Sequence, residues 1–241
     1  MVPIARACAC DTYFTVDPTG ELCLKPGTMG LRQTLYYGTG SHTFVKANYP
    51  WLSRIEVEVQ AGGGGSAGAN AAANEAIPRP GGAGGGYSKS LLAVSALGAS
   101  VPITVGAGGT AGGATTEGGD GRPSSFGSLV IATGGSGGTN NMPSGTSLNT
   151  GQGIAGPGAG TGSFAVGGGA SGSAIRLSGG YAMAGHGGDS FLGTGGLGRT
   201  TEGAGLTSRG YGAGAGGGLS FGGSVTGGVG GAGRVIVHLY G

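Results

Sequence analysis

Glycine is the feature of this chain that most limits what it can fold into, because it makes up 65 of the 241 residues. Ordinary proteins contain roughly 7% glycine. Glycine has no side chain to bury, and it loses more backbone entropy on folding than any other residue. A large hydrophobic core is therefore excluded for most of the chain, and its stability has to come from another source.

The glycines are concentrated in the later part of the sequence. Residues 1–61 contain five of them, whereas from there to the end one residue in three is glycine. The composition thus changes near residue 61, just after the first strong strand pattern. Composition therefore indicates a domain boundary near residue 61.

Charge and hydropathy exclude several classes of protein. Only 9% of the residues are charged, the net charge is +2, and there is no run of like charges, so no nucleic-acid partner is expected. A mean hydropathy of +0.12 is unlike that of a disordered chain. Neither a signal sequence nor a run of 18 apolar residues is present, so no membrane insertion is expected.

The three cysteines lie close to the N-terminus, at Cys8, Cys10 and Cys23. Together with His42 they could ligate a metal, but their spacing matches no zinc motif. Buried or free thiols are the preferred interpretation. We expect no metal site and no cofactor, and the glycine-rich region has no cysteine to crosslink it.

Alternation of apolar and polar residues predicts strands. Residues 54–60 alternate throughout, which places Ile55, Val57 and Val59 on one buried face. Trp51 is expected in the core beside this strand. Further strands are predicted where apolar tracts stand between glycine-rich stretches, at residues 89–94, 101–105, 128–133 and 234–240. The strands at 54–60 and 234–240 enclose the glycine-rich region, so we expect them to pair in one sheet.

Two shorter segments are also interpretable. Residues 12–16 and 21–25 read as strands around a turn at 17–20, which contains Pro18 and Gly20. Residues 69–76 are rich in alanine and could form two helical turns before Pro78, although this is below the length at which a helix is stable alone.

The stretch from residue 134 to 233 is mostly glycine and is too long for an ordinary loop. Collagen needs glycine at every third residue, and the runs 167–169 and 173–178 break that register. A flexible linker would lack the interspersed Val, Ile, Phe and Tyr residues. Packed extended chains remain, with the dihedral angles of polyproline II and with amides free to bond to neighbouring chains. Such packing is stable only if nearly every buried amide finds a partner.

The predicted fold class is therefore all-β. It combines a base, a β-sandwich of short strands, with a glycine-rich region that is either polyglycine-II-like or layered from loops.

Three motifs suggest enzymes but lack the context that catalysis needs. Residues 106–111 fit G-x-G-x-x-A and residues 134–138 fit G-x-S-x-G, yet no helix is predicted after either one. Residues 186–190 contain His, Asp and Ser, but close sequence neighbours cannot adopt the geometry of a triad, and a polar loop tip is the simpler interpretation. Carboxylates suited to a glycosidase are scarce. We expect no catalytic residues and no enzyme activity.

A few larger side chains interrupt the small residues of the glycine-rich region. They are either staples that fill gaps between layers or exposed platforms that bind sugar rings or protein surfaces. On the second interpretation they are candidate binding residues at loop tips: Tyr181, Met183, His186, Phe191 and Tyr211.

A set of ordered motifs resembles the glycine-rich domain of bacteriophage tail proteins. The motifs are residues 37–45 (YGTGSHTFV), 54–65 (RIEVEVQAGGGG), 84–88 (GGGYS), 103–109 (ITVGAGG), 124–127 (SSFG) and 231–237 (GAGRVIV). The resemblance covers about residues 37–241 and implies that they form a glycine-rich tail domain. Residues 1–36, a β-rich attachment segment on this division, are similar to the leading segment of minor tail proteins from phages of actinobacteria. The resemblance implies a structural component of the virion, at the tail tip or tail fibre, that contributes to host adsorption.

The same resemblance implies partners. A homotrimer is expected, with other phage tail proteins contacted through residues 1–36 and a host cell-surface receptor, glycan or protein, as the ligand. Two other functions stay open at this stage. One is a glycine-rich matrix or ice-binding protein that acts through a regular surface, and the other is an enzyme that degrades host capsule.

Overall fold

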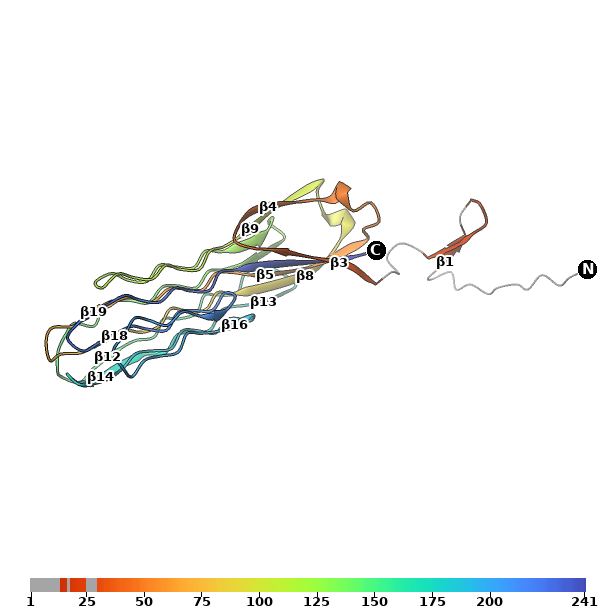
Figure 1. Ribbon diagram of the computed structural model, residues 1–241. Coiled ribbons are helices and arrows are strands. Elements are labelled where there is room, and N and C mark those ends of the chain that lie inside the picture. Colours follow the sequence, from red (N-terminus) through yellow and green to blue (C-terminus); the bar gives the residue numbers. More distant parts are fainter. Residues whose placement is uncertain (1–13, 17, 25–29) are drawn as a thin grey trace, which may run out of the picture.

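A computed structural model describes residues 14–16, 18–24 and 30–241. The structure is all-β, as predicted, and is elongated. A β-sandwich, here called the base, forms one end, and glycine-rich extended segments run from it to the opposite, distal end (Figure 1). The C-terminus lies at the base.

Two antiparallel sheets form the base. The five-stranded sheet has the order β13-β8-β5-β20-β3, and the four-stranded sheet has the order β11-β10-β9-β4. The strands of the first are β3 (Leu31–Tyr37), β5 (Arg54–Gln60), β8 (Tyr87–Ala93), β13 (Phe164–Val166) and β20 (Arg234–Tyr240). Those of the second are β4 (Gly40–Val45), β9 (Ser100–Val105), β10 (Ser124–Phe126) and β11 (Val130–Ala132). Short 3-10 turns η1 (Lys46–Asn48) and η2 (Val94–Ala96) follow β4 and β8.

The core of the base is built by the alternation predicted from sequence. Ile55, Val57 and Val59 point inward from β5 and are fully buried. They pack with Val235, Val237 and Leu239 of β20 and with the inward residues of the other sheet, including Phe44, Ile103 and Phe126. Because β20 pairs with β5 along its whole length, the predicted pairing of the two ends of the glycine-rich region is confirmed. Trp51 is half-buried against this core and carries the Arg32 guanidinium 4.4 Å from its ring centroid.

The base includes residues that precede residue 37. Strand β3 begins at Leu31 and pairs with β20 from Tyr240 to Val235, so the five-stranded sheet starts ahead of the predicted boundary. The expected N-terminal hairpin is present as β1 (Phe14–Val16) and β2 (Leu22–Leu24). Parts of its predicted strands and turn, at residues 12–13, 17 and 25, lie outside the described residues, as do Cys8 and Cys10.

The helical turns considered for residues 69–76 do not form. The segment contains β6 (Ala69–Asn70) and a turn, and β7 (Ile77–Pro78) follows. The two strands pair with β19 (Ser224–Val225) and β18 (Leu219–Ser220), respectively. The alanine-rich sequence favours a helix, but these tertiary backbone hydrogen bonds outweigh that local preference.

Beyond the base, the central segment 61–67 shows how the glycine-rich chain folds. Successive amide groups donate to different neighbours, and the pattern repeats every three residues. The N–H groups of Ala61 and Gly64 bond to segment 79–86, those of Gly62 and Gly65 to segment 117–122, and those of Gly63 and Ser66 to segment 227–233, at N···O distances of 2.8–3.0 Å. Three residues per turn is the periodicity of polyproline II.

The carbonyl groups of the same segment follow the same period. Gly62 and Gly65 accept from segment 133–138, Gly63 and Ser66 from segment 106–112, and Gly64 from segment 212–217. One extended segment is thus hydrogen-bonded to six neighbours. This is the predicted polyglycine-II-like arrangement, and we call it the polyglycine-II bundle.

Two further segments have the same central position. Segment 79–86 bonds to segments 61–67, 133–138, 212–217, 167–172 and 184–189. Segment 212–217 bonds to both of the other central segments and also to segments 184–189, 193–198, 204–208 and 229–233. Residues 61–69, 76–88 and 212–220 are buried throughout, so their amides depend on these bonds.

Glycine is required here because the segments approach so closely. A Cβ atom at Gly62, Gly63, Gly64 or Gly65 would lie 2.0–2.2 Å from a carbonyl oxygen of an adjacent segment. Ser66 is tolerated because its hydroxyl takes part in the bonding, donating to the Gly216 carbonyl at 2.7 Å and accepting from the Gly228 amide at 2.8 Å.

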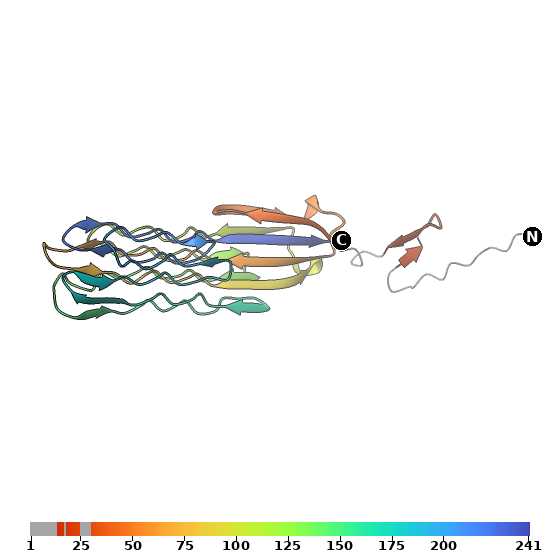
Figure 2. The same ribbon diagram turned by 60° about the horizontal axis from the view of Figure 1, so that its bottom comes forward.

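Small strand pairs close the ends of the bundle. At the distal end lie the β6–β19 and β7–β18 pairs and a three-stranded sheet of β12 (Asn149–Gly151), β14 (Ala174–Ser178) and β15 (Tyr181–Met183), seen from a second side in Figure 2. Strands β16 (Gly193–Thr194) and β17 (Arg209–Gly210) form a hairpin near the base. No helix among the described residues is long and apolar enough to cross a membrane.

The packing of the bundle predicts that replacing glycine by alanine destabilises the protein strongly at some positions and hardly at others. In Gly64→Ala the new Cβ would lie 2.0 Å from the Ser136 carbonyl oxygen. In Gly180→Ala the new Cβ would have no atom of another segment within 4 Å. We expect the first variant to lose at least about 3 kcal/mol, since neighbouring backbone must move, and its melting temperature to fall by about 6 °C or more. Gly180→Ala should melt as the wild type does. Equal melting temperatures would contradict the close packing.

Candidate binding surface at the distal end

The three-stranded sheet at the distal end has one inward and one outward face. Ala174 and Arg176 of β14 point inward and are 1% and 3% exposed. Ile175 therefore faces outward, and the register places Thr150 of β12 and Met183 of β15 beside it on that face.

Large apolar side chains gather on the outward face. Tyr181 precedes Met183 by two residues on β15 and so lies on this side. Leu177 lies at an irregularity in the β14–β15 register, between Arg176 and Ser178, and Leu148 directly precedes β12. Leu148, Leu177, Tyr181 and Met183 are 69%, 59%, 74% and 49% exposed. We call Leu148, Ile175, Leu177, Tyr181 and Met183 the distal patch. Clustered exposed apolar residues of this kind mark interaction surfaces.

Uncharged hollows adjoin the patch. The largest, of about 640 Å³, is lined by Thr150, Gly151, Gln152, Ser173, Ala174, Ile175 and Met183. A hollow of about 240 Å³ shares residues 150–152 with it and adds Asn141 and Asn149. Another, of about 220 Å³, shares Ser173 and Met183 and adds His186. Their hydroxyl and amide groups can form hydrogen bonds with a ligand that carries no charge.

Two buried arginines fix the chain beneath the patch. The Arg176 guanidinium donates to the carbonyl groups of Ser147, Ala76 and Pro143 at 2.6–2.8 Å. It thereby ties the segment before β12 to the start of β7. Hydrogen bonds from a charged donor are stronger than those between neutral groups.

Arg79 has the same role on the neighbouring segment. It is 4% exposed and donates to the carbonyl groups of Gly68, Asn140 and Met142 at 2.6–2.8 Å. Burial lowers the pKa of Arg79 to about 10, so the guanidinium is still charged at neutral pH. Both arginines satisfy carbonyl groups where the regular bundle ends.

Three of the five candidate residues predicted from sequence lie at this surface. Tyr181 and Met183 are on β15, and His186 lines a hollow together with Met183. The ring Nδ1 of His186 lies 2.9 Å from the Gly187 carbonyl oxygen. The stretch 186–190 is not a loop tip, because the amides of Gly187 and Gly188 bond to Gly196 and Gly82 inside the bundle.

The other two predicted residues lie near the base. Phe191 stacks on Tyr87 with ring centroids 4.1 Å apart, and Phe164 meets both rings edge-on. The Arg234 guanidinium lies 5.0 Å from the Tyr211 ring centroid. These two aromatic residues pack where the bundle joins the five-stranded sheet, and they are separate from the distal patch.

Sequence reasoning missed the aliphatic members of the patch. Leu148, Ile175 and Leu177 belong to it, and the alternation over residues 174–178 is the signal that could have identified two of them. The short tract, flanked by glycine, was interpreted only as an interruption of the glycine pattern.

Comparison with known proteins agrees with this architecture. A family model described as a glycine-rich domain matches residues 39–240. The chain belongs to this glycine-rich domain family. The match runs from the start of β4 to the end of β20, so it covers most of the base and the whole bundle. No protein with a curated description matches the chain.

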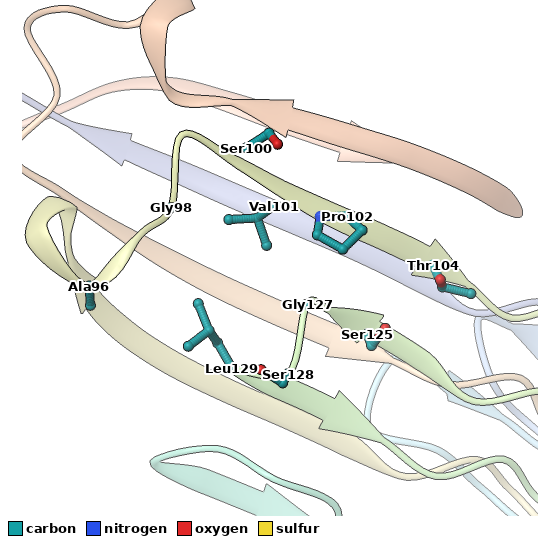
Figure 3. A pocket seen from close by; sticks show the side chains of 10 residues that line it. All are labelled: Ala96, Gly98, Ser100, Val101, Pro102, Thr104, Ser125, Gly127, Ser128 and Leu129. Atoms are coloured by element: carbon teal, nitrogen blue, oxygen red, sulfur yellow. The ribbon is translucent and has the colours of Figure 1, made fainter.

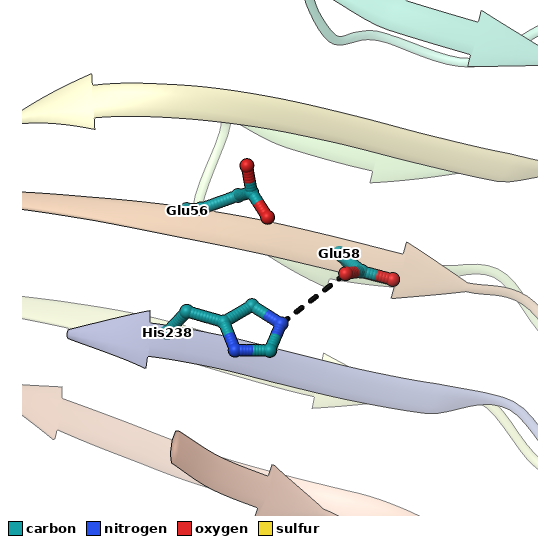
Figure 4. A group of neighbouring side chains, drawn as sticks. All are labelled: Glu56, Glu58 and His238. Atoms are coloured by element: carbon teal, nitrogen blue, oxygen red, sulfur yellow. Dashed lines mark hydrogen bonds and ion pairs between the residues drawn. The ribbon is translucent and has the colours of Figure 1, made fainter. Parts of the chain in front are cut away.

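Two other features of the glycine-rich domain have the outward form of a binding site. The first is a group of Glu56, Glu58 and His238 on the outward face of the five-stranded sheet, whose ligand atoms lie within 4.8 Å of one another (Figure 4). Lys89 already supplies a positive charge there, with its Nζ 2.9 Å from Glu56 and 3.9 Å from Glu58. The hydrogen bond to Glu56 raises the pKa of Lys89.

Glu58 in this group also has hydrogen-bond partners. Tyr87 donates its hydroxyl to one Glu58 oxygen at 2.8 Å, and His238 Nε2 lies 3.2 Å from the other. His238 Nδ1 is in turn 3.1 Å from the Thr34 hydroxyl. The group is therefore explained as a cross-strand network of charges and hydrogen bonds without a metal.

The second feature is a hollow of about 390 Å³ on the base, between β9 and the turn from β10 to β11 (Figure 3). Its lining is small and uncharged, with hydroxyl groups from Ser100, Thr104, Ser125 and Ser128 around Pro102. Val45 of β4, which pairs with Ser100 and is 37% exposed, is the exposed apolar side chain next to it, whereas the distal patch gathers several such side chains.

The Arg176 contacts predict a stability effect. Arg176→Met leaves three carbonyl groups without their donor, and we expect a loss of about 2–4 kcal/mol. Arg209→Met replaces an exposed arginine and should change stability by less than about 0.5 kcal/mol. Urea unfolding of the three proteins measures both values. Similar midpoints for the two variants would contradict the role given to Arg176.

The surroundings of Tyr87 predict how the stability of the fold depends on pH. Burial, followed by the hydrogen bond to Glu58, raises the pKa of Tyr87 above its ordinary value of 10.0. The neutral phenol thus stabilises the fold fully below pH 10, and this contribution is lost as the pH rises through the higher folded pKa. Stability should therefore fall more steeply above pH 10 in the wild type than in Tyr87→Phe. Parallel curves of unfolding free energy against pH would refute this.

Proposed function

We propose that this glycine-rich domain protein is a structural component of a phage tail that holds a receptor-binding surface away from the rest of the virion. The distal patch binds the host cell surface, and residues 1–36 attach the chain to other tail proteins. The assembly is a homotrimer, and the protein acts by binding and display without catalysing a reaction.

The bundle supports this proposal mechanically. Its segments are joined sideways by backbone hydrogen bonds at nearly every step, as in segment 61–67. Such a rod resists bending because bending would break many bonds together. Both ends of the described body, Leu31 and Gly241, lie at the base, so the distal patch is the part farthest from the point of attachment.

The chemistry of the distal patch is the single observation that carries the assignment. Its exposed groups are aliphatic and aromatic, and hydroxyl and amide groups line the adjoining hollows. These groups suit recognition of a surface. The buried guanidinium of Arg176 holds the patch in one shape, which lowers the entropic cost of binding.

The resemblance of the ordered motifs to phage tail proteins supports the location on the virion. It extends over the same part of the chain that the glycine-rich domain family covers. Labelling of purified virions with an antibody against this chain tests the location directly. Label at the tail supports it, and its absence from the tail would refute it.

Receptor binding is tested with two matched leucines. Leu177 on the distal patch and Leu91 on the base are both 59% exposed. We expect Leu177→Ser combined with Tyr181→Ala to weaken binding of the purified protein to host cells at least about tenfold, as for residues at the centre of an interface. Leu91→Ser should bind as the wild type does. Unchanged binding by the double variant would exclude the distal patch as the receptor site.

A further inference from the structure

A row of side chains crosses the outward face of the five-stranded sheet and carries an exposed aromatic ring at each end. Directly paired residues on neighbouring strands point to the same side of a sheet, and Glu58 alternates with the buried residues of β5. The register gives one residue of this row to each strand: Phe164, Lys89, Glu58, Ile236 and Tyr36. Phe164 and Tyr36, at the two ends, are 49% and 62% exposed.

Two more rings lie over the adjoining row, toward the bundle. Phe191 stacks on Tyr87 with ring centroids 4.1 Å apart and an angle of 19° between the ring planes. Tyr87 covers one face of this ring, yet Phe191 is 58% exposed, so its other face is open to solvent. Tyr211 lies beside the Arg234 guanidinium and is 44% exposed. Tyr87 and Arg234 pair with Gln60 from opposite sides, which places these two rings between the end rings.

The β16–β17 pair holds Phe191 and Tyr211 in place. Phe191 comes before β16 and Tyr211 directly follows β17, and the two strands pair with each other. The Ser190 hydroxyl donates to the Tyr211 carbonyl at 2.5 Å. Since neighbouring strands lie about 4.8 Å apart, the rings extend over about 19 Å of the sheet. We call Phe164, Phe191, Tyr211 and Tyr36 the ring row.

Charged side chains lie among these rings, where a ligand can reach them. The Lys89 Nζ is 2.9 Å from a Glu56 oxygen and 3.9 Å from a Glu58 oxygen. The side chains of Lys89 and Glu56 are 36% and 25% exposed. The cations Lys89 and Arg234 balance the carboxylates of Glu56 and Glu58. This balance favours an uncharged ligand over an anion.

The combination of open rings and accessible charges selects the chemistry of the ligand. An apolar protein surface docked on the rings would remove water from Lys89 and Glu56 and return no hydrogen bond, which is costly. A proline-rich segment has carbonyl acceptors, but its prolines have no N–H group to donate to Glu56. The C–H groups of a sugar can stack on the negative face of an aromatic ring, and its hydroxyl groups both donate and accept.

We propose that the ring row binds an uncharged oligosaccharide, which lies across the strands of the five-stranded sheet. Its sugar rings stack on Phe191 and the neighbouring aromatic rings, and its hydroxyl groups bond to Lys89 and Glu56. The ring row is a second binding surface, at the side of the base. It depends neither on the distal patch nor on a place in a virion.

A glycan array, followed by calorimetric titration of the purified full chain, tests this proposal. The array carries uncharged, uronic-acid-containing and sulfated oligosaccharides, and a proline-rich peptide is titrated beside them. We expect binding of uncharged oligosaccharides. Phe164→Leu combined with Phe191→Leu removes two rings but keeps apolar side chains, and it should weaken this binding at least about tenfold. Phe221→Leu makes the same change between β18 and β19, at the distal end, and should bind as the wild type does.

Two further variants separate ring stacking from folding and from general apolar contact. Tyr36→Leu does not touch the stack on Tyr87 and should also weaken binding, so it tests the ring row if the double variant melts early. Leu91 is 59% exposed on the same face but carries no ring, and Leu91→Ser should bind as the wild type does.

Several results would overturn the proposal. These are binding only to acidic or sulfated sugars, binding only to the peptide, binding to none of the probes, and ring variants that bind as the wild type does. Equal weakening by Leu91→Ser would replace ring stacking with general apolar contact and would overturn it as well. The distal double variant, Leu177→Ser with Tyr181→Ala, should keep its oligosaccharide binding. Failure at the ring row is thereby distinguished from failure of the receptor site.

Discussion

Backbone hydrogen bonding between neighbouring extended segments is the interaction on which the rest of this structure depends. A sheet strand bonds to two neighbours, but segment 61–67 bonds to six because its amides rotate by a third of a turn at each residue. The arrangement needs glycine where segments touch, since a Cβ at Gly64 would overlap the Ser136 carbonyl. The glycine content that rules out a large hydrophobic core thus makes this second kind of interior possible.

The β-sandwich sets the register of the bundle. Strand β5 continues directly into segment 61–67, and segment 227–233 leads into β20, so the β5–β20 ladder aligns two bundle segments before their glycines begin to bond. Gln60 lies at this junction and is fully buried, and its side-chain amide donates to the carbonyl groups of Gly85 and Gly86. Its Oε1 atom has no hydrogen-bond partner. At the opposite end, Arg79 and Arg176 satisfy the carbonyl groups that the regular pattern leaves over. The distal patch is therefore held by a continuous set of bonds from base to tip.

The sequence was sufficient to predict the parts of the fold that side chains specify. Alternation in residues 54–60 and the apolar tract at 234–240 identified two central strands, and their positions at the two ends of the glycine-rich region predicted their pairing. The broken glycine pattern excluded collagen in favour of packed extended chains. The neighbours of each bundle segment were not predictable, because glycine carries no side chain to distinguish one partner from another. The short tract 69–76 was wrongly considered helical, because the strand partners that decide its structure, at residues 219–225, are remote in sequence.

At the candidate site, Tyr181 and Met183 were recognisable as large residues among small ones. The buried role of Arg176 and the contribution of Leu148 depend on tertiary contacts that no local pattern reveals.

Amide hydrogen exchange measures the central claim most directly. If the bundle is hydrogen-bonded as described, the amides of residues 61–67, 79–86 and 212–217 exchange as slowly as those of β5 and β20, because all of them open only when the domain unfolds as a whole. Peptides that cover exposed turns, such as residues 113–116, should exchange rapidly in the same sample. Rapid exchange across the three central segments, with β5 and β20 still protected, would mean that the glycine-rich region is a flexible extension of the sandwich and cannot hold a surface at its tip.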